Sequence, residues 1–354
     1  MNILIIKLSA IGDVIHALPV SHAIKETFPE ARTTWVVEPP ARELLEGNPY
    51  IDDILLFEKK KFKESLGGFV RNFGPFRRRL RAGRFDIALD LQGLGKSAAI
   101  AWFSGAPRRL GTCNMRELSD HISHPVIGPH AKGHIVERYL DVARAIGCRV
   151  DKVVFPVVLS EREQTLAIRI LEQGGVPQGA RYAVLVPGAN WPNKRWPAKS
   201  FAALADWLYD QELIPVLVGG GPVDENRAAE IEAQAKLPPV NLTGRTSLRQ
   251  LAAILSNAAV TVGGDTGPVH LAAGLRVPTV MIMGPTDANR NGPYDQSQNA
   301  IEVTRPCRYC WKRACPKGLD CLASIPVERV TEQLAALTTK AKSPVPKAPT
   351  PGKK

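Results

Sequence analysis

Short runs of β-branched and aliphatic residues alternate with helix-patterned segments along the whole chain. This alternation is typical of parallel α/β units, in which a helix crosses over from each strand to the next. The first half predicts strands near 2–7, 33–38, 53–57, 85–90 and 108–111, and helices near 13–27, 40–46, 62–82, 95–104 and 134–147. The second half predicts strands near 181–186, 213–218, 239–242, 259–263 and 278–283, and helices near 161–173, 198–210, 223–235, 247–256, 267–274 and 326–339.

The pattern is interrupted at 153–156 and resumes with a charged helix at Ser160. A chain of 354 residues has room for about two domains of roughly 150 residues. We therefore expect two doubly wound domains, 1–155 and 156–337, and a basic, proline-rich, disordered tail at 338–354. Ligands of such sheets bind at the carboxyl ends of the strands, so two facing domains create an interdomain cleft.

Several classes of protein are excluded by the distribution of apolar residues and cysteines. The sequence has no apolar run of the roughly 18 residues that a membrane span needs. Lys7 and Asp13 interrupt the apolar N-terminus, which indicates a buried first strand rather than a signal peptide. Six cysteines without a secretion signal predict reduced thiols and a cytoplasmic location.

The turn after the first strand argues against a dinucleotide cofactor. A dinucleotide fingerprint needs Gly-x-Gly-x-x-Gly at this turn, and only Gly12 is present in 7–13. The turn instead carries Asp13 at the start of the first helix. A carboxylate at this position is most often a helix-capping group.

The turn at 263–270 has the composition of an anion site. Its small residues and Pro268 begin a helix whose backbone N–H groups can hold a phosphate. Asp265 would orient neighbouring groups or a ribose, and His270 lies close enough to face the same ligand. Each residue alone has a structural explanation as a cap or a core histidine, but together they favour a binding site.

Two further loops of the second half extend this site. Lys194 and Arg195, in 187–197, would neutralise a diphosphate without a metal ion. Asp224, after the glycines at 219–221, would accept hydrogen bonds from a ribose or would cap a helix. These loops contain no Asp-x-Asp pair, and the sequence contains no Gly-x-x-x-x-Gly-Lys-Ser/Thr loop. A nucleotide-sugar donor is therefore favoured over an NTPase, with neither a metal site nor a cofactor expected.

Four cysteines follow a Cys-x2-Cys-x4-Cys-x5-Cys pattern at positions 307, 310, 315 and 321. This spacing is compact enough for zinc but lacks the two separated pairs of a zinc ribbon. Structural zinc and a redox-labile pair remain alternatives. Buried free thiols are the favoured interpretation.

Five motifs occur together in order: Lys-x-Ser-x-x-Gly-Asp13, Asp90-Leu-Gln-Gly-Leu with Lys96-Ser97, Asn193-Lys-Arg-Trp-Pro, Asp265-Thr-Gly-x-x-His270 and Gly284-Pro-Thr-Asp287. In this combination the chain resembles the bacterial lipopolysaccharide heptosyltransferases over about residues 1–337. The resemblance implies a GT-B glycosyltransferase fold of two Rossmann-like domains. It also implies inverting, metal-independent transfer of L-glycero-D-manno-heptose from ADP-heptose to the lipopolysaccharide inner core.

The resemblance also implies roles for individual residues. Asp13 matches the catalytic base that deprotonates the acceptor hydroxyl, and Lys194 matches the lysine on the donor diphosphate. The remaining donor-binding positions are Asp224 on the ribose, Thr246 at the adenine, and Asp265, Thr266, Gly267 and His270 in the donor-binding turn.

The motifs leave the acceptor open. The 90–94 block and the 9–13 loop resemble the first heptosyltransferase, which acts on Kdo, whereas 187–189 and 193–197 resemble the second, which acts on heptose. We favour the first. The alternatives are a relative that uses another nucleotide sugar and, in a different class, a non-catalytic basic protein that binds nucleic acid or a lipid surface.

Basic charge is concentrated in two segments. The net charge is +12, of which 59–84 contributes +9 and 338–354 contributes +5, so the remainder is slightly acidic. Six apolar residues (Phe62, Leu66, Phe69, Val70, Phe73 and Phe76) interleave with the charges of 59–84. Part of this segment is therefore expected in a membrane interface, with a solvated helix face as the alternative.

The acceptor of the family that the chain resembles suggests a function for the basic segment 59–84. That acceptor is the anionic Kdo–lipid A glycolipid at the cytoplasmic face of the inner membrane, and the segment would attract both it and the anionic bilayer. No nucleic-acid recognition module accompanies the basic residues. The acceptor-binding residues we predict are Lys59, Lys60, Lys61, Lys63, Arg77, Arg78, Arg79 and Gln92.

Overall fold

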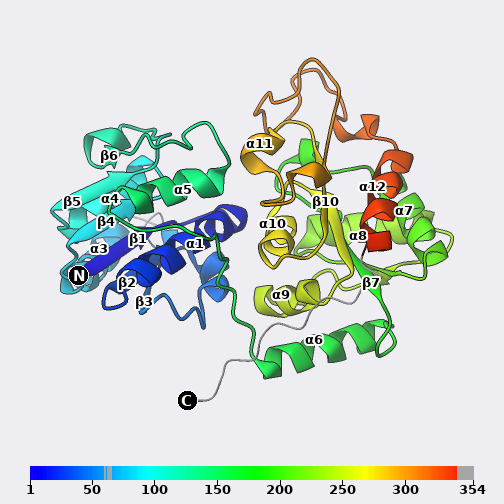
Figure 1. Ribbon diagram of the computed structural model, residues 1–354, viewed down its shortest axis with the longest axis horizontal. Coiled ribbons are helices and arrows are strands. Elements are labelled where there is room, and N and C mark those ends of the chain that lie inside the picture. The colour runs from blue at the N-terminus through cyan, green and yellow to red at the C-terminus, as the bar shows by residue number, and fades with distance from the viewer. Residues whose placement is uncertain (60, 62–65, 341–354) are drawn as a thin grey trace.

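The computed structural model describes residues 1–59, 61 and 66–340, which form two parallel six-stranded sheets side by side (Figure 1). The order of the first sheet is β3-β2-β1-β4-β5-β6, and every pair of neighbouring strands is parallel. Its strands are β1 (Asn2–Ile6), β2 (Arg32–Val37), β3 (Asp53–Leu56), β4 (Ile87–Asp90), β5 (Arg108–Gly111) and β6 (His124–Pro125).

Helices cover both faces of this sheet. They are α1 (Ile11–Thr27), α3 (Leu66–Ala82), α4 (Gly95–Ser104) and α5 (Ile135–Arg144), with the 3-10 helices η1 (Pro39–Leu44) and η2 (Ser119–His121). Because strand side chains alternate between faces, Ile3 and Ile5 pack with α1 and α5, whereas Leu4 and Ile6 pack with Leu80 of α3 and with α4. The strands are buried on both faces, as parallel strands usually are.

The second sheet repeats this plan, with the order β12-β11-β10-β7-β8-β9. Its strands are β7 (Tyr182–Val186), β8 (Ile214–Leu217), β9 (Val240–Asn241), β10 (Val260–Gly264), β11 (Thr279–Met283) and β12 (Ala300–Glu302). Its helices are α6 (Glu161–Gly174), α7 (Ala198–Asp210), α8 (Pro222–Gln234), α9 (Leu248–Ser256), α10 (Gly267–Gly274), α11 (Ala288–Asn291) and α12 (Val327–Lys340), with the 3-10 helices η3 (Pro192–Lys194), η4 (Ser297–Asn299) and η5 (Leu322–Ser324).

The predicted α/β architecture is confirmed, with some local differences. The helix expected at 40–46 is the 3-10 helix η1, in which Ala41 N–H donates to Glu38 and Leu45 N–H donates to Arg42. These bonds run from residue i to i−3 rather than to i−4, and the segment ends after six residues, as short 3-10 helices do. The edge strands β6 and β12 were not predicted, because strands of two and three residues carry too short a pattern.

The two halves are joined by a linker between α5 and α6, and the predicted boundary at 155/156 lies within it. Across the interface, α1 packs against α10, and η1 packs against α9. At the C-terminal end, α12 continues to Lys340, so the start of the disordered tail predicted at 338 is wrong; the rest of that tail, 341–354, lies outside the described residues. No helix among the described residues has the length and apolar character to span a membrane.

Candidate active site

Each sheet reverses its strand order at one point, and ligands of open α/β sheets bind at such points. In the first sheet the reversal lies between β1 and β4, and in the second it lies between β7 and β10. The two switch points meet where α1 contacts α10. A Cβ atom built on Gly12 would lie 3.2 Å from Cδ2 of His270 and 3.5 Å from Cα of Gly267. The residue before Asp13 thus lies against the predicted donor-binding turn.

A network of hydrogen bonds surrounds Asp265 at the second switch point. Lys194 Nζ and Thr286 Oγ1 each lie 2.6 Å from Oδ2 and donate to it. His270 Nε2 lies 2.8 Å from Oδ1. Burial would raise the pKa of Asp265, but the bonds from His270 and Lys194 outweigh it and hold the pKa well below its usual range. Asp265 is therefore a carboxylate that holds a lysine and a histidine in place.

Lys194 and the start of α10 form an electropositive corner beside this carboxylate. The Lys194 ammonium lies 4.5 Å from the centre of the Trp191 ring, a cation–π contact. Thr266 is the N-cap of α10, and in this part of the described chain its side chain makes no capping bond. Pro268 has no N–H, and the N–H groups of Val269 and His270 donate to the Thr266 carbonyl. Gly267, at the start of the helix, is therefore the position of this turn from which an N–H can meet an anion.

The structure gives Gly267 a further role. A Cβ at this position would lie 3.0 Å from Cγ2 of Ile11 and 3.4 Å from the Gly12 nitrogen. Contacts this tight leave little room for a side chain. The glycine therefore allows α10 to approach the start of α1.

Asp13 lies in the first turn of α1 and is half-buried. Its Oδ2 accepts a hydrogen bond from Ala10 N–H at 3.2 Å, so the capping interpretation is confirmed. This bond orients the carboxylate at the first switch point, and a catalytic role for Asp13 remains a prediction.

Lys7 is a buried ammonium next to this turn that the sequence reasoning missed. It donates to the Leu91 carbonyl at 3.0 Å and to Tyr139 Oη at 2.7 Å. Burial lowers the pKa of Lys7, but the nearby Tyr139 and Asp13 outweigh burial and raise it. The signal was available, because Lys7 interrupts an otherwise apolar first strand.

Gln92 also organises the loop before Asp13. Its Oε1 accepts hydrogen bonds from Leu8 N–H at 3.1 Å and Ser9 N–H at 3.2 Å. The structure thus gives Gln92 a role in loop shape. Its predicted contact with the acceptor remains a prediction.

Asp224 and Thr246 lie at the same edge of the second sheet as Lys194, Asp224 at the start of α8 and Thr246 in the loop after β9. Asp224 Oδ2 accepts from Gly220 N–H at 2.9 Å in the first turn of α8, as the capping interpretation predicts. Thr246 is half-buried directly before α9. The loops after β8 and β9 are joined by a hydrogen bond of 3.0 Å from Gly244 N–H to the Gly219 carbonyl. Their predicted nucleoside contacts remain predictions.

The basic segment divides into two parts. Lys59 and Lys61 are exposed just after β3, at the carboxyl edge of the first sheet, and Lys61 pairs with Glu58 at 2.6 Å. Arg77, Arg78 and Arg79 are exposed on α3, which covers the opposite sheet face from α1. At 1.5 Å per residue, Arg77 lies about 17 Å along the helix from Leu66. Lys60 and Lys63 lie outside the described residues.

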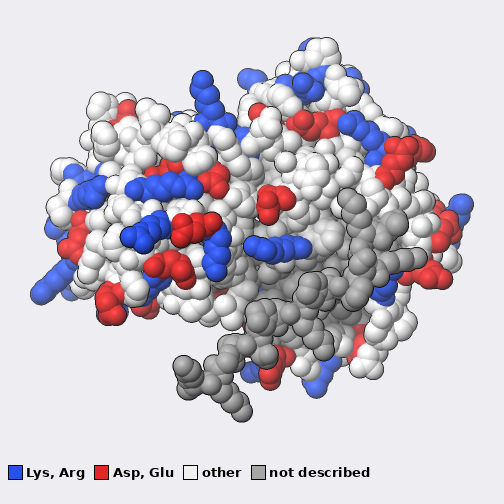
Figure 2. All heavy atoms as spheres, in the orientation of Figure 1, with Lys and Arg blue, Asp and Glu red and all other residues white. Residues whose placement is uncertain are grey.

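Two aromatic residues of this segment pack against the protein. The Phe73 and Phe103 rings are 4.8 Å apart, and the Phe76 and Phe57 rings are 5.6 Å apart. Phe73 and Phe76 thus cover the α3 side of the sheet, and the expectation that part of this segment lies in a membrane interface remains a prediction. In Figure 2, basic and acidic side chains are interspersed over the visible face of the first half.

All six cysteines of the described chain carry free thiols, but the prediction that the four at 307, 310, 315 and 321 are buried is wrong, because Cys307 and Cys310 are exposed and Cys315 and Cys321 are half-buried. They lie in a long loop after β12, which is attached to the loop after β11 by Tyr309 N–H to Gly284 and Trp311 N–H to Pro285. A loop over the sheet edge cannot bury these side chains as a core strand would. Across the described residues, no group of three or more His, Cys, Asp or Glu side chains is arranged to hold a metal ion.

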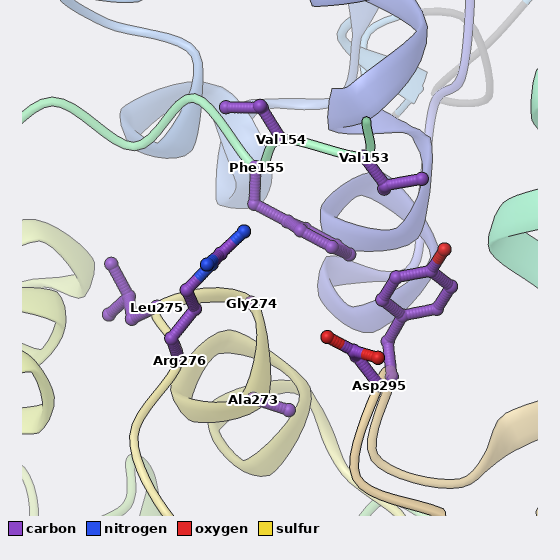
Figure 3. A pocket seen from close by; sticks show the side chains of 9 residues that line it. Val153, Val154, Phe155, Ala273, Gly274, Leu275, Arg276 and Asp295 are labelled. Carbon is purple, nitrogen blue, oxygen red and sulfur yellow. The ribbon is translucent and has the colours of Figure 1, made fainter. Parts of the chain in front are cut away.

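A pocket of ≈ 240 Å³ lies at the other end of α10 from Asp265. It is lined by the linker at 153–155, by 273–276 and by Tyr294 and Asp295. Figure 3 shows Arg276 pointing toward Phe155 of the linker. This pocket is separate from the Asp265 network.

Two doubly wound domains with facing switch points, one bearing a carboxylate and the other a lysine beside a helix N-terminus, form the GT-B fold. The model of glycosyltransferase family 9 (heptosyltransferase) matches residues 74–319. The chain belongs to this family. It is therefore an enzyme rather than a non-catalytic binding protein.

Curated relatives and solved structures agree with this assignment. Lipopolysaccharide heptosyltransferase 1 of Pseudomonas aeruginosa is 30% identical, covering 89% of this chain and 87% of its own. Lipopolysaccharide heptosyltransferase 2 of Escherichia coli K12 is 27% identical, covering 95% and 98%. The solved family 9 glycosyltransferase of Veillonella parvula has a TM-score of 0.84 at 24% identity, and the match covers 96% of this chain and 97% of that one. The solved E. coli heptosyltransferase WaaC with ADP has a TM-score of 0.73 at 25% identity, and the match covers 95% of this chain and 100% of that one.

Proposed function

We propose that this chain transfers L-glycero-D-manno-heptose from ADP-heptose to the Kdo of the lipopolysaccharide inner core, with inversion and without a metal ion. This is the reaction of heptosyltransferase I. The observation that carries the proposal is the network of Lys194, Asp265 and His270, which lies across a helix contact from the turn of Asp13.

The donor would bind at the second switch point. Lys194 and the N–H groups at the start of α10, including those at Thr266 and Gly267, would neutralise the diphosphate and stabilise its charge as it leaves. Asp224 would accept from the ribose, and Thr246 would meet the adenine. The solved E. coli heptosyltransferase WaaC with ADP supports adenosine diphosphate as the nucleotide of the donor.

The acceptor would approach from the first sheet. Asp13 would remove the proton from the Kdo hydroxyl as its oxygen bonds to the anomeric carbon from the face opposite ADP. The bond from that carbon to the diphosphate breaks at the same time, and ADP leaves with the electron pair. Contact between α1 and α10 would help to exclude water that would otherwise hydrolyse the donor.

The glycolipid would extend from this cleft toward the basic segment. Lys59 and Lys61 lie at the cleft edge, so they would meet the charged sugars. Arg77, Arg78 and Arg79 lie farther along α3 and would contact lipid phosphates or an anionic bilayer. The same proposal places the enzyme peripherally at the cytoplasmic face of the inner membrane.

The first experiment measures ADP release from ADP-heptose in the presence of EDTA, with and without delipidated Kdo–lipid A. Release that depends on this acceptor is expected, and NMR of the product should show the inverted anomeric configuration. The Asp13→Asn variant should still bind ADP in calorimetry but lose turnover. An absence of release with this acceptor would overturn the proposal.

The second candidate is heptosyltransferase II, favoured by the relative of that name, which aligns over 95% of this chain. Release of ADP only when a heptosylated core is supplied would establish this function. Release with neither acceptor would direct the search to other nucleotide sugars.

A further inference from the structure

Three histidines from separate helices meet where the two halves of the molecule touch. They are His16 of α1, His134 at the N-cap of α5, and His270 of α10. The His16 ring centre lies 4.2 Å from that of His270 and 5.7 Å from that of His134. His16 and His270 are buried, with 3% and 5% of their surface exposed.

The hydrogen bonds of His270 indicate which of its nitrogens carries a proton. Its Nε2 lies 2.8 Å from Oδ1 of Asp265, whose depressed pKa shows that it is a carboxylate. A carboxylate accepts, so His270 Nε2 carries the proton. In a neutral ring, Nδ1 is then a bare acceptor, and it is buried with no hydrogen-bond partner among the described residues.

Both ring nitrogens of His134, in contrast, have hydrogen-bond partners. Its Nδ1 accepts from Val136 N–H at 3.2 Å, and its Nε2 donates to the Gly292 carbonyl at 3.0 Å. Burial lowers the pKa of His134 to about 4, so its ring is neutral at ordinary pH. His134 therefore has neither a donor nor an acceptor left for its neighbours.

The hydrogen-bonding groups of the His16 ring, in contrast, are unused. Both of its ring nitrogens are buried, and neither has a hydrogen-bond partner in the described chain. Burial, together with His270 and His134, lowers its pKa well below the ordinary value, so the ring is neutral with one N–H and one lone pair unused. The nearby charges act in opposite directions, since Asp265 raises this pKa and Lys7 lowers it. An apolar side chain would fill the same space without this cost.

The His16 ring, which has an unused N–H, packs against the His270 ring, whose Nδ1 has no hydrogen-bond partner among the described residues. We propose that His16 is a positioning residue that donates a hydrogen bond to Nδ1 of His270 when the donor site is occupied. This bond continues the chain of contacts from Lys194 through Asp265 and His270 into α1. The inference rests on the proposed function of this network as the donor site.

The consequence for catalysis follows from the helix geometry. His16 lies three residues after Asp13, so both share one side of α1 about a turn apart. Fixing His16 against His270 would thus fix the carboxylate relative to the sugar on the donor. A Cβ built on Gly12 would lie only 3.2 Å from Cδ2 of His270, so the two helices pack closely and have little freedom to slide.

Kinetics of three variants test this role. His16→Leu is expected to lower kcat by about tenfold, because a shift of 1 Å in the reacting groups costs up to roughly 100-fold, while KM for ADP-heptose and Tm change little. His16→Gln, which retains an N–H donor, should recover part of kcat. The matched control is His22→Leu, since His22 is a buried histidine of the same helix that contacts Tyr50 and Glu26 instead.

Wild-type kcat in His16→Leu would overturn the inference. A loss of kcat in His16→Leu that follows a loss of Tm, and that the His16→Gln variant does not improve, would also overturn the inference.

A spectroscopic measurement separates this inference from the proposed function. The ¹⁵N signals of the histidine rings are recorded in the free wild-type protein and at saturating ADP, while calorimetry measures ADP binding independently. We expect His270 Nδ1 to shift from a bare to a hydrogen-bonded value when ADP binds. Bound ADP with an unchanged Nδ1 overturns the inference alone, whereas absence of ADP binding overturns both.

Discussion

Replacing Gly264 by alanine tests whether the end of β10 supports Lys194 in its position. A Cβ at this glycine would lie 2.1 Å from the Lys194 carbonyl oxygen, whereas ordinary contact begins at 3.4 Å. The backbone of residue 194 would therefore have to retreat by about 1.3 Å, or β10 would have to bend. The obstacle is a backbone atom, so a rotamer change cannot relieve it.

The cost can be worked out from these contacts. Overpacking a close contact costs about 1–3 kcal/mol, and a rigid obstacle places Gly264→Ala in the upper half of that range. For domains of this size, about 2 kcal/mol corresponds to a decrease in Tm of roughly 4–8 °C. A displacement of Lys194 by about 1 Å should also reduce kcat/KM by up to roughly 100-fold.

Differential scanning calorimetry and ADP-heptose turnover measure the two effects. The matched control is Gly74→Ala in α3, where an added Cβ meets nothing within 4 Å. Alanine in a helix interior is favoured over glycine by about 1 kcal/mol, but Pro75 follows directly and its ring disfavours a Cβ at the preceding helical residue. The two effects oppose each other, so this control should keep Tm and turnover close to those of the wild type. A Gly264→Ala protein with unchanged Tm and unchanged donor affinity would refute the proposed support of Lys194 by β10.

Three further predictions follow from buried polar contacts. Arg249→Ala should lower the free energy of unfolding by about 2–4 kcal/mol, measured by urea denaturation, because Arg249 bonds the carboxylate of Glu163 and the carbonyl of Glu46. The Arg249 bond lowers the pKa of Glu163 from 4.5 to about 2. The stabilisation by this ion pair is therefore full above about pH 5 and is lost as the pH falls toward 2. If the free energies of unfolding of the variant and the wild type differed equally at pH 7 and at pH 3, the reasoning would be contradicted. Asp265→Asn should reduce kcat/KM for the donor by about 100-fold or more, while circular dichroism shows that the protein is still folded. Near-normal turnover would show that the carboxylate does not position Lys194. Trp196→Phe should lower the free energy of unfolding by about 2 kcal/mol, because the buried indole N–H donates to the Ile325 carbonyl at 2.9 Å, and an unchanged urea midpoint would exclude this.

Much of the fold could be predicted because its elements have strong local signals. The helices at 95–104, 198–210 and 267–274 agree with the structure at both ends, since glycine, proline or polar residues bound each apolar pattern. The short edge strands β6 and β12 could not be predicted, because their pairing depends on a neighbouring strand rather than on their own two or three residues.

The candidate site could be predicted only in part. Asp13, Lys194 and Asp265 lie in turns after strands, where a motif is visible in sequence. His16 and Tyr139 lie at core-facing positions of helices and resemble core residues, so their contacts with His270 and Lys7 depend on how distant segments pack. Sequence alone also left α3 unplaced, and only the packing of Phe73 and Phe76 shows which side of the sheet it covers.

The contacts of Arg249 have a consequence for how the two halves can move. This side chain joins α9 to the carbonyl of Glu46 in the first half and to the linker carbonyl of Val158, so one corner of the interface is fastened beside the linker itself. At the opposite corner, His134 contacts Gly292 and Tyr294 Oη donates to Glu137, and Figure 1 shows α5 and α11 on the other side of the α1–α10 contact from α9. An opening motion that keeps the Arg249 contacts intact is a rotation of the two halves about this corner of the interface. Its widest displacement then falls between α5 and α11, so this is the side from which substrates have the most room to enter.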